Sequence, residues 1–156
     1  MSIEVSLKAV VFEMEGQFEG STAYLNRKTG ELHTIAEELI DEVEDDHSSD
    51  LPAWQKQELD KAREIEGSED WLALPSKFDI HEYDIMARFS ASYPDEKVSA
   101  DLNDAIRGGG AFQRFKSLIR RRGIEQEWYR YREEALLRLA IEWLEENKIA
   151  FKMDSD

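Results

Sequence analysis

The chain has 156 residues, of which 41% are hydrophobic and 35% are charged, and its net charge at pH 7 is −15. This length fits one domain with a real hydrophobic core, and the negative charge predicts repulsion from nucleic acids and anionic membranes. The absence of cysteine excludes disulfides, thiolate nucleophiles and Cys-ligated metals.

The N-terminal residues lack the basic segment and following apolar stretch of a signal peptide, and no apolar run reaches the roughly 20 residues of a membrane span. We therefore expect a cytoplasmic protein.

Residues 5–15 place Val, Leu and Met side chains on one helical stripe, while the β-branched valines among them favour a strand. Between these alternatives we expect a helix.

Residues 21–35 predict a hairpin, because a short polar loop ending in Gly30 separates two apolar runs. Residues 36–50 follow with eight acidic side chains, and their mutual repulsion predicts an extended or mobile segment. Pro52 predicts the start of a polar helix over residues 53–65. The apolar run 71–75 ends in proline and fits an edge strand against the hairpin.

From Asp79 the pattern is persistently helical. Asp79 is expected to cap a helix with Glu82 as its capping-box partner. Further helices are predicted near 95–106, 111–122 and 124–147. Buried stripes are expected in the first and last of these four helices, at Ile80, Tyr83, Ile85, Met86, Ala87 and Phe89, and at Ile124, Trp128, Tyr131, Ala135, Leu139 and Trp143.

The charge is unevenly spread along the chain. Residues 1–106 carry 9 basic and 26 acidic side chains, whereas residues 107–132 carry 8 basic and 2 acidic ones. In the helix predicted over 111–122, one arc centred on Phe115 and including Phe112 is apolar, and Arg and Lys side chains occupy the opposite half. This basic helix is therefore expected to place one side in the core and the other toward solvent or a partner.

Three glycines precede the basic helix, and they permit two interpretations. They fit a tight turn between two helices, with the arginines forming surface ion pairs within the chain. They also fit an anion site, because a helix N-terminus offers free N–H groups and glycine lets a ligand approach closely. The candidate anion- or partner-binding residues are Arg107, Gly108, Gly109, Gly110, Arg114, Lys116, Arg120 and Arg121.

No catalytic or metal-binding pattern emerges from the remaining polar residues. The three histidines, His33, His47 and His81, do not have the spacing of a zinc site, and the acidic run has no EF-hand pattern. We expect no metal and no cofactor. We find no nucleophile elbow and no HExxH motif, so an enzyme of unknown type is the least supported alternative. A deep cleft lined by His81, Glu82 or Asp84 would support it.

Four segments carry a resemblance to a known family: residues 23–32 (AYLNRKTGEL), 74–89 (LPSKFDIHEYDIMARF), 105–116 (AIRGGGAFQRFK) and 127–149 (EWYRYREEALLRLAIEWLEENKI). Together they resemble uncharacterised protein family zero-one-five-eight, a group of small bacterial proteins. The family usually has another basic residue near position 109 or 113, where this chain has Gly109 and Gln113. The resemblance implies a bacterial, cytoplasmic origin and a shared fold, and it implies no activity.

We predict one α+β domain over residues 1–156 that is mainly α, with a helical C-terminal body and a small N-terminal antiparallel hairpin or sheet. The polarised charge predicts a non-enzymatic interaction or regulatory module with a protein partner. A phosphate- or nucleic-acid-binding protein that uses residues 107–122 is the alternative. The same polarity is also compatible with a homo-oligomer.

Overall fold

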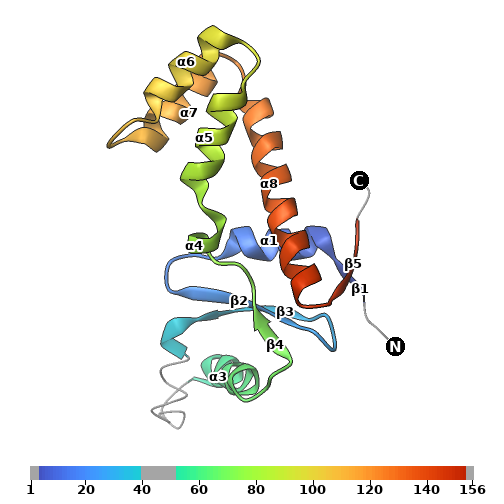
Figure 1. The fold of residues 1–156 in the computed structure, drawn as a ribbon. Coiled ribbons are helices and arrows are strands. Elements are labelled where there is room, and N and C mark those ends of the chain that lie inside the picture. Colours follow the sequence, from blue (N-terminus) through green and yellow to red (C-terminus); the bar gives the residue numbers. More distant parts are fainter. Residues whose placement is uncertain (1–3, 40–51, 154–156) are drawn as a thin grey trace. The chain divides into compact units, whose positions relative to one another are not determined.

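A computed structural model of the chain describes residues 4–39 and 52–153, so residues 40–50 of the predicted acidic segment lie outside it. The protein is mainly helical with a small antiparallel sheet near the N-terminus, as the sequence predicts (Figure 1). It divides into a sheet unit, Met1–Asp79 with Leu139–Asp156, and a helical unit, Ile80–Arg138. That residues 1–156 form a single domain stays a prediction. Two compact units that unfold in one cooperative transition would still count as one domain.

The predicted hairpin forms the centre of the sheet unit. Strand β2 (Ser21–Asn26) pairs antiparallel with β3 (Leu32–Ala36) on one side and with β4 (Trp71–Ala73) on the other. Gly30 closes the hairpin loop with a φ of 80°, as expected. The apolar run at 71–75 therefore does supply an edge strand.

Helix α1 (Leu7–Gly16) confirms the helical interpretation for residues 7–15, whereas Val5 and Ser6 lie in a strand. The Ser6 side chain caps its first turn, and Leu7, Val10, Val11 and Met14 are buried. The sequence analysis did not predict the parallel pair of β1 (Glu4–Ser6) and β5 (Ala150–Lys152), whose residues are distant in sequence. Three-residue strands are too short to show a clear alternation, so their pairing is not readable from the pattern.

Helix α3 (Ala53–Glu66) begins after Pro52, as predicted, and it has no side-chain cap. Its buried residues Ala62 and Ile65 pack with Ile35 of β3 and Trp71 of β4. Lys61 places its ammonium 4.9 Å from the centroid of the Trp71 ring. A cation over an indole face is favourable, so this contact links the helix to the edge strand.

The predicted capping box at Asp79 and Glu82 is wrong in position. One half of such a box forms one turn earlier, where the Asp79 carboxylate accepts hydrogen bonds from the backbone N–H and the hydroxyl of Ser76 at the start of α4 (Lys77–Ile80). Helix α5 (Glu82–Ser92) instead begins after His81, which has a left-handed φ of 52° and makes no capping bond.

The helical unit contains α5, α6 (Glu96–Ala105), α7 (Ala111–Arg121) and the first part of α8 (Glu125–Glu146). Asp95 caps α6 by accepting hydrogen bonds from the N–H groups of Lys97 and Val98. In α5, Ile85, Met86 and Phe89 are buried as expected, while the Tyr83 ring is half-exposed and its hydroxyl donates to the Ile106 carbonyl. Within the described residues, no helix is long and apolar enough to cross a membrane.

The buried residues of α8 match the predicted stripe only at its start. Ile124 and Trp128 are buried as expected, but the next fully buried positions are Leu136, Ala140 and Leu144 rather than Ala135, Leu139 and Trp143. Residues 135 and 136 both lie about two helical turns after Trp128, so the helical period alone does not decide which of them is buried. The stripe over residues 131–143 is therefore only partly buried.

Candidate functional site

Helix α7 has the two-sided character that its sequence predicts. Ala111, Phe115, Leu118 and Ile119 are buried, whereas Lys116, Ser117, Arg120 and Arg121 are exposed. The fully buried Phe115 ring lies 4.8 Å from that of Trp128 and 6.0 Å from that of Phe89, measured between centroids. Phe112 was expected in the apolar arc, but 47% of it is exposed.

The three glycines form the turn between α6 and α7. Gly108 and Gly110 have φ angles of +71° and +77°, a region that residues with a side chain rarely adopt. Gly110 occupies the N-cap position of α7, and no side chain caps the helix there. Gly109 has neither a positive φ nor a close neighbour at the position of a Cβ, so the turn does not demand glycine at that residue.

Arg114 is bound to this turn. Its guanidinium donates hydrogen bonds to the backbone carbonyls of Ala105, Arg107 and Gly109. These carbonyls lie at the end of α6 and in the glycine turn, where the last C=O groups of a helix lack partners within the helix. Arg114 therefore holds the turn together, and its donors are not directed at an external anion.

We expect Arg114→Ala to lower the free energy of unfolding by about 1–2 kcal/mol, because three carbonyls lose a charged donor that is exposed to solvent. Urea unfolding followed by circular dichroism measures this change. Lys116→Ala is the matched control, since it removes an exposed cation two residues further along the same helix. Equal stability of the two variants would show that Arg114 does not hold the turn.

The other cations of this region differ in their partners. Arg107 lies 3.8 Å from Asp104, Arg120 lies 3.9 Å from Glu125, and Arg122 pairs with Asp101. The first two pairs are exposed, and such pairs contribute little to stability. Lys116 and Arg121 have no ion pair or hydrogen bond with any residue that the structure describes. Among the cations of α7, these two side chains are therefore the ones that have neither a carboxylate nor a carbonyl partner in the described part of the chain.

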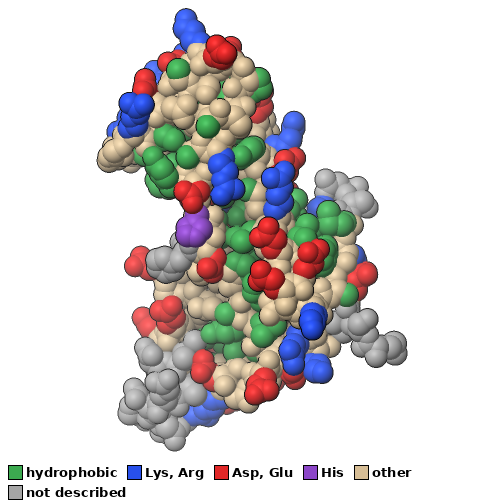
Figure 2. Space-filling model, in the orientation of Figure 1, with side chains coloured by type: hydrophobic (Ala, Val, Ile, Leu, Met, Phe, Trp, Pro, Cys, Tyr) green, Lys and Arg blue, Asp and Glu red, His purple; other side chains and the backbone are tan. Residues whose placement is uncertain are grey.

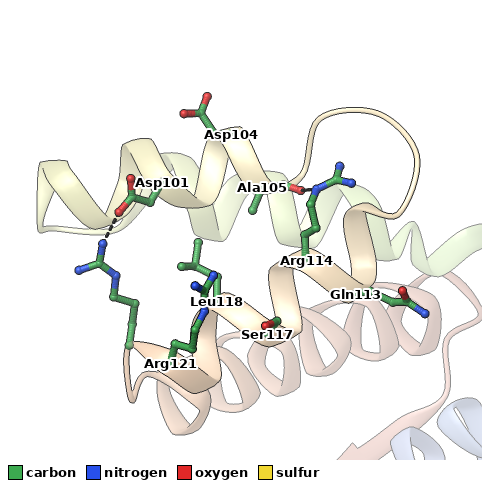
Figure 3. A pocket seen from close by; sticks show the side chains of 9 residues that line it. Asp101, Asp104, Ala105, Gln113, Arg114, Ser117, Leu118 and Arg121 are labelled. Carbon is green, nitrogen blue, oxygen red and sulfur yellow. Dashed lines mark hydrogen bonds and ion pairs between the residues drawn. The ribbon is translucent and has the colours of Figure 1, made fainter.

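A groove with a volume of about 820 Å³ runs between α6 and α7 (Figure 3). Asp101 and Asp104 line it from α6, and Arg114 and Arg121 line it from α7, so residues of both charges surround it. In Figure 3 the Asp104 carboxylate points away from α7. Its remaining lining residues are Ala105, Gln113, Ser117, Leu118 and Arg122. The sequence analysis missed Asp101 and Asp104, although their spacing of three on one predicted helix indicates a shared face.

The residues considered for catalysis or metal binding do not converge. His33 of β3 contacts Glu58 of α3 at 3.2 Å, and Glu82 is held by Arg132 through paired hydrogen bonds. His81 and Asp84 are exposed, and His47 lies outside the described residues. No group of three or more metal-ligating side chains occurs in the described part of the chain.

Side chains of both charges lie on the surface of the helical unit (Figure 2).

The structure brings the site residues predicted from sequence to one helix and the turn before it, but these residues have separate roles. Arg107 and Arg120 contact carboxylates, Arg114 contacts carbonyls, and Lys116 and Arg121 contact neither. The interpretation of all eight as one binding site stays a prediction.

Comparison with known proteins gives one finding. The family model described as "Uncharacterised protein family (UPF0158)" matches residues 48–156. No curated protein and no solved structure matches the chain.

Proposed function

Because the chain belongs to uncharacterised protein family UPF0158, whose description names no activity, we propose a function from the geometry of α7. The protein is a non-enzymatic interaction module that binds an acidic surface of a partner protein. The contact is made by the cationic face, which we define as the exposed residues Gln113, Lys116, Ser117, Arg120 and Arg121 of α7.

The observation that supports this proposal most strongly is the state of Lys116 and Arg121. The chain carries 35 acidic and 20 basic side chains, yet these two cations have no described partner. No acidic residue occurs in the sequence between Asp104 and Glu125, so neither cation has a carboxylate neighbour on its own helix. Carboxylates of another molecule can approach them without displacing an existing ion pair.

The groove beside this face favours a protein partner over a nucleic acid. Asp101 and Asp104 line the groove together with Arg121, and their carboxylates offer a phosphate no hydrogen-bond donor on the α6 side. Arg114, the clamp expected for a phosphate, donates to backbone carbonyls instead. A protein surface can present groups of both signs to the two sides of the groove, whereas a phosphate backbone cannot.

The experiment is affinity capture of the tagged chain from lysate of its own organism, with and without nuclease. Wild type is compared with Lys116→Ala/Arg121→Ala and with the control Arg88→Ala/Arg138→Ala, which removes the same charge from α5 and α8. We expect wild type and control to retain a nuclease-resistant protein partner, and the α7 variant to lose on the order of tenfold in recovery. Raising the salt to about 0.5 M should weaken the wild-type capture.

Three outcomes would count against the proposal. The α7 variant and the control could retain the partner equally, or the capture could be insensitive to salt. The captured material could also be RNA or DNA that nuclease removes, which would support the nucleic-acid alternative.

A further inference from the structure

A second pocket, with a volume of about 240 Å³, lies between the end of α5 and the first turns of α8. It is separate from the groove beside α7, and no lining residue is shared. The residues that line it are Phe89, Ser92, Tyr93, Pro94, Glu127, Arg130, Tyr131 and Glu134. All of them belong to the helical unit.

The inner wall of this pocket is aromatic. The buried Phe89 ring lies 5.7 Å from Tyr93 and 5.4 Å from Tyr131, with the rings inclined at 63° and 60°. Behind Phe89 lie Phe115 and Trp128. The two half-buried tyrosines are thus positioned by the aromatic core, and such rings attract cations through their negative faces.

The outer rim of the pocket carries two carboxylates and one guanidinium. The Glu127 carboxylate accepts a hydrogen bond from the Tyr93 hydroxyl, and this bond is the largest reason that the pKa of Tyr93 is raised. Glu134 and Arg130 lie one helical turn apart, but they form no ion pair with each other or with another described residue. Glu134 therefore brings an unneutralised negative charge to an aromatic pocket.

We propose that this pocket binds an alkylated ammonium group. A weakly hydrated cation of this kind can contact aromatic rings with its methyl groups and keep its charge close to carboxylates. An anion would face two carboxylates against the single Arg130 guanidinium, and a neutral apolar group would gain nothing from the carboxylates. The site goes beyond the proposed function and stands independently of the cationic face.

The test uses the full chain and two probes of nearly equal shape, choline and its neutral analogue 3,3-dimethylbutan-1-ol. Binding is followed by NMR through the ring signals of the aromatic residues. We expect saturable shifts with choline and about three- to tenfold weaker binding of the alcohol. A blocked trimethyl-lysine is titrated in parallel, and the tighter of the two cations distinguishes a free small molecule from a modified side chain of a partner.

Three single substitutions give expected changes of different sign. Glu134→Gln should weaken choline binding about threefold, and Arg130→Gln should strengthen it by a similar factor, because they remove opposite charges from the rim. Glu133→Gln should leave it unchanged, since Glu133 is exposed on the same helix but does not line the pocket.

The proposal is overturned if choline produces no saturable shift or if the alcohol binds as tightly as choline. It is also overturned if Glu134→Gln and Glu133→Gln have the same effect. All three substituted residues are exposed, so their replacement should leave the fold intact, and circular dichroism of each variant checks this directly.

Discussion

Replacing Phe115 with alanine is expected to lower the free energy of unfolding by about 3–5 kcal/mol. Phe115 is fully buried in α7 and contacts both Trp128 of α8 and Phe89 of α5. Removal of its ring leaves a cavity at the point where three helices of the helical unit meet. Urea unfolding of the full chain, followed by circular dichroism, measures the loss.

Phe112→Ala is the matched control for this prediction. It removes the same ring from the same helix, but 47% of Phe112 is exposed, so the expected cost is below about 1 kcal/mol. A similar loss in both variants would contradict the orientation of α7. The cationic face would then no longer be defined, because its exposure depends on Phe115 pointing into the core.

Gln17→Leu is expected to lower the free energy of unfolding by about 2–5 kcal/mol. The buried Gln17 side chain accepts a hydrogen bond from the Ala23 N–H at 2.9 Å and donates one to the Pro75 carbonyl at 2.8 Å. Its amide therefore joins β2 to the residues that follow β4. Leucine has a similar volume but no polar group, so two buried backbone groups would lose their partners.

Gln57→Leu is the control for the change at residue 17, because Gln57 is an exposed glutamine of α3 in the same unit. We expect it to change the free energy of unfolding by less than about 0.5 kcal/mol. Both variants are compared by urea unfolding. If Gln17→Leu were as stable as Gln57→Leu, the buried Gln17 amide would not be what joins β2 to the residues that follow β4.

Local patterns in the sequence predicted most of the fold. Gly30 and the polar residues before it fix the hairpin, Pro52 marks the start of α3, and Gly123 ends the basic helix. Each of these signals comes from the conformational limits of one residue, so it is readable without knowledge of the rest of the chain. The parallel pairing of Val5 with Phe151 has no such local signal.

The candidate site was predicted less completely, because side-chain partners depend on tertiary structure. The sequence places Arg114 and Lys116 on the polar half of one helix, and both were expected to bind a ligand. Only the path of the glycine turn brings three carbonyls to Arg114. Gln17 is a similar case, since a glutamine after Gly16 gives no sign that its amide will be buried between two segments.

The pocket of Phe89, Tyr93 and Tyr131 was missed for a different reason. The helical period assigns Tyr131 to the core, and its burial is in fact only partial. Tyr93 precedes Pro94 at the end of a predicted helix, so no periodic signal relates it to α8. Phe89 and Tyr93 are four residues apart in the chain, but the pocket forms only where α8 brings Tyr131 beside them.

The most direct test of the cationic face is a site-specific photo-crosslink in cells of the source organism. A photoreactive benzoylphenylalanine replaces Ser117, at the centre of the face, or Glu133, an exposed position on α8. We predict a covalent adduct with a protein from position 117 and none from position 133. An adduct from position 133 alone, or nucleic acid as the only product at position 117, would contradict a protein partner on α7.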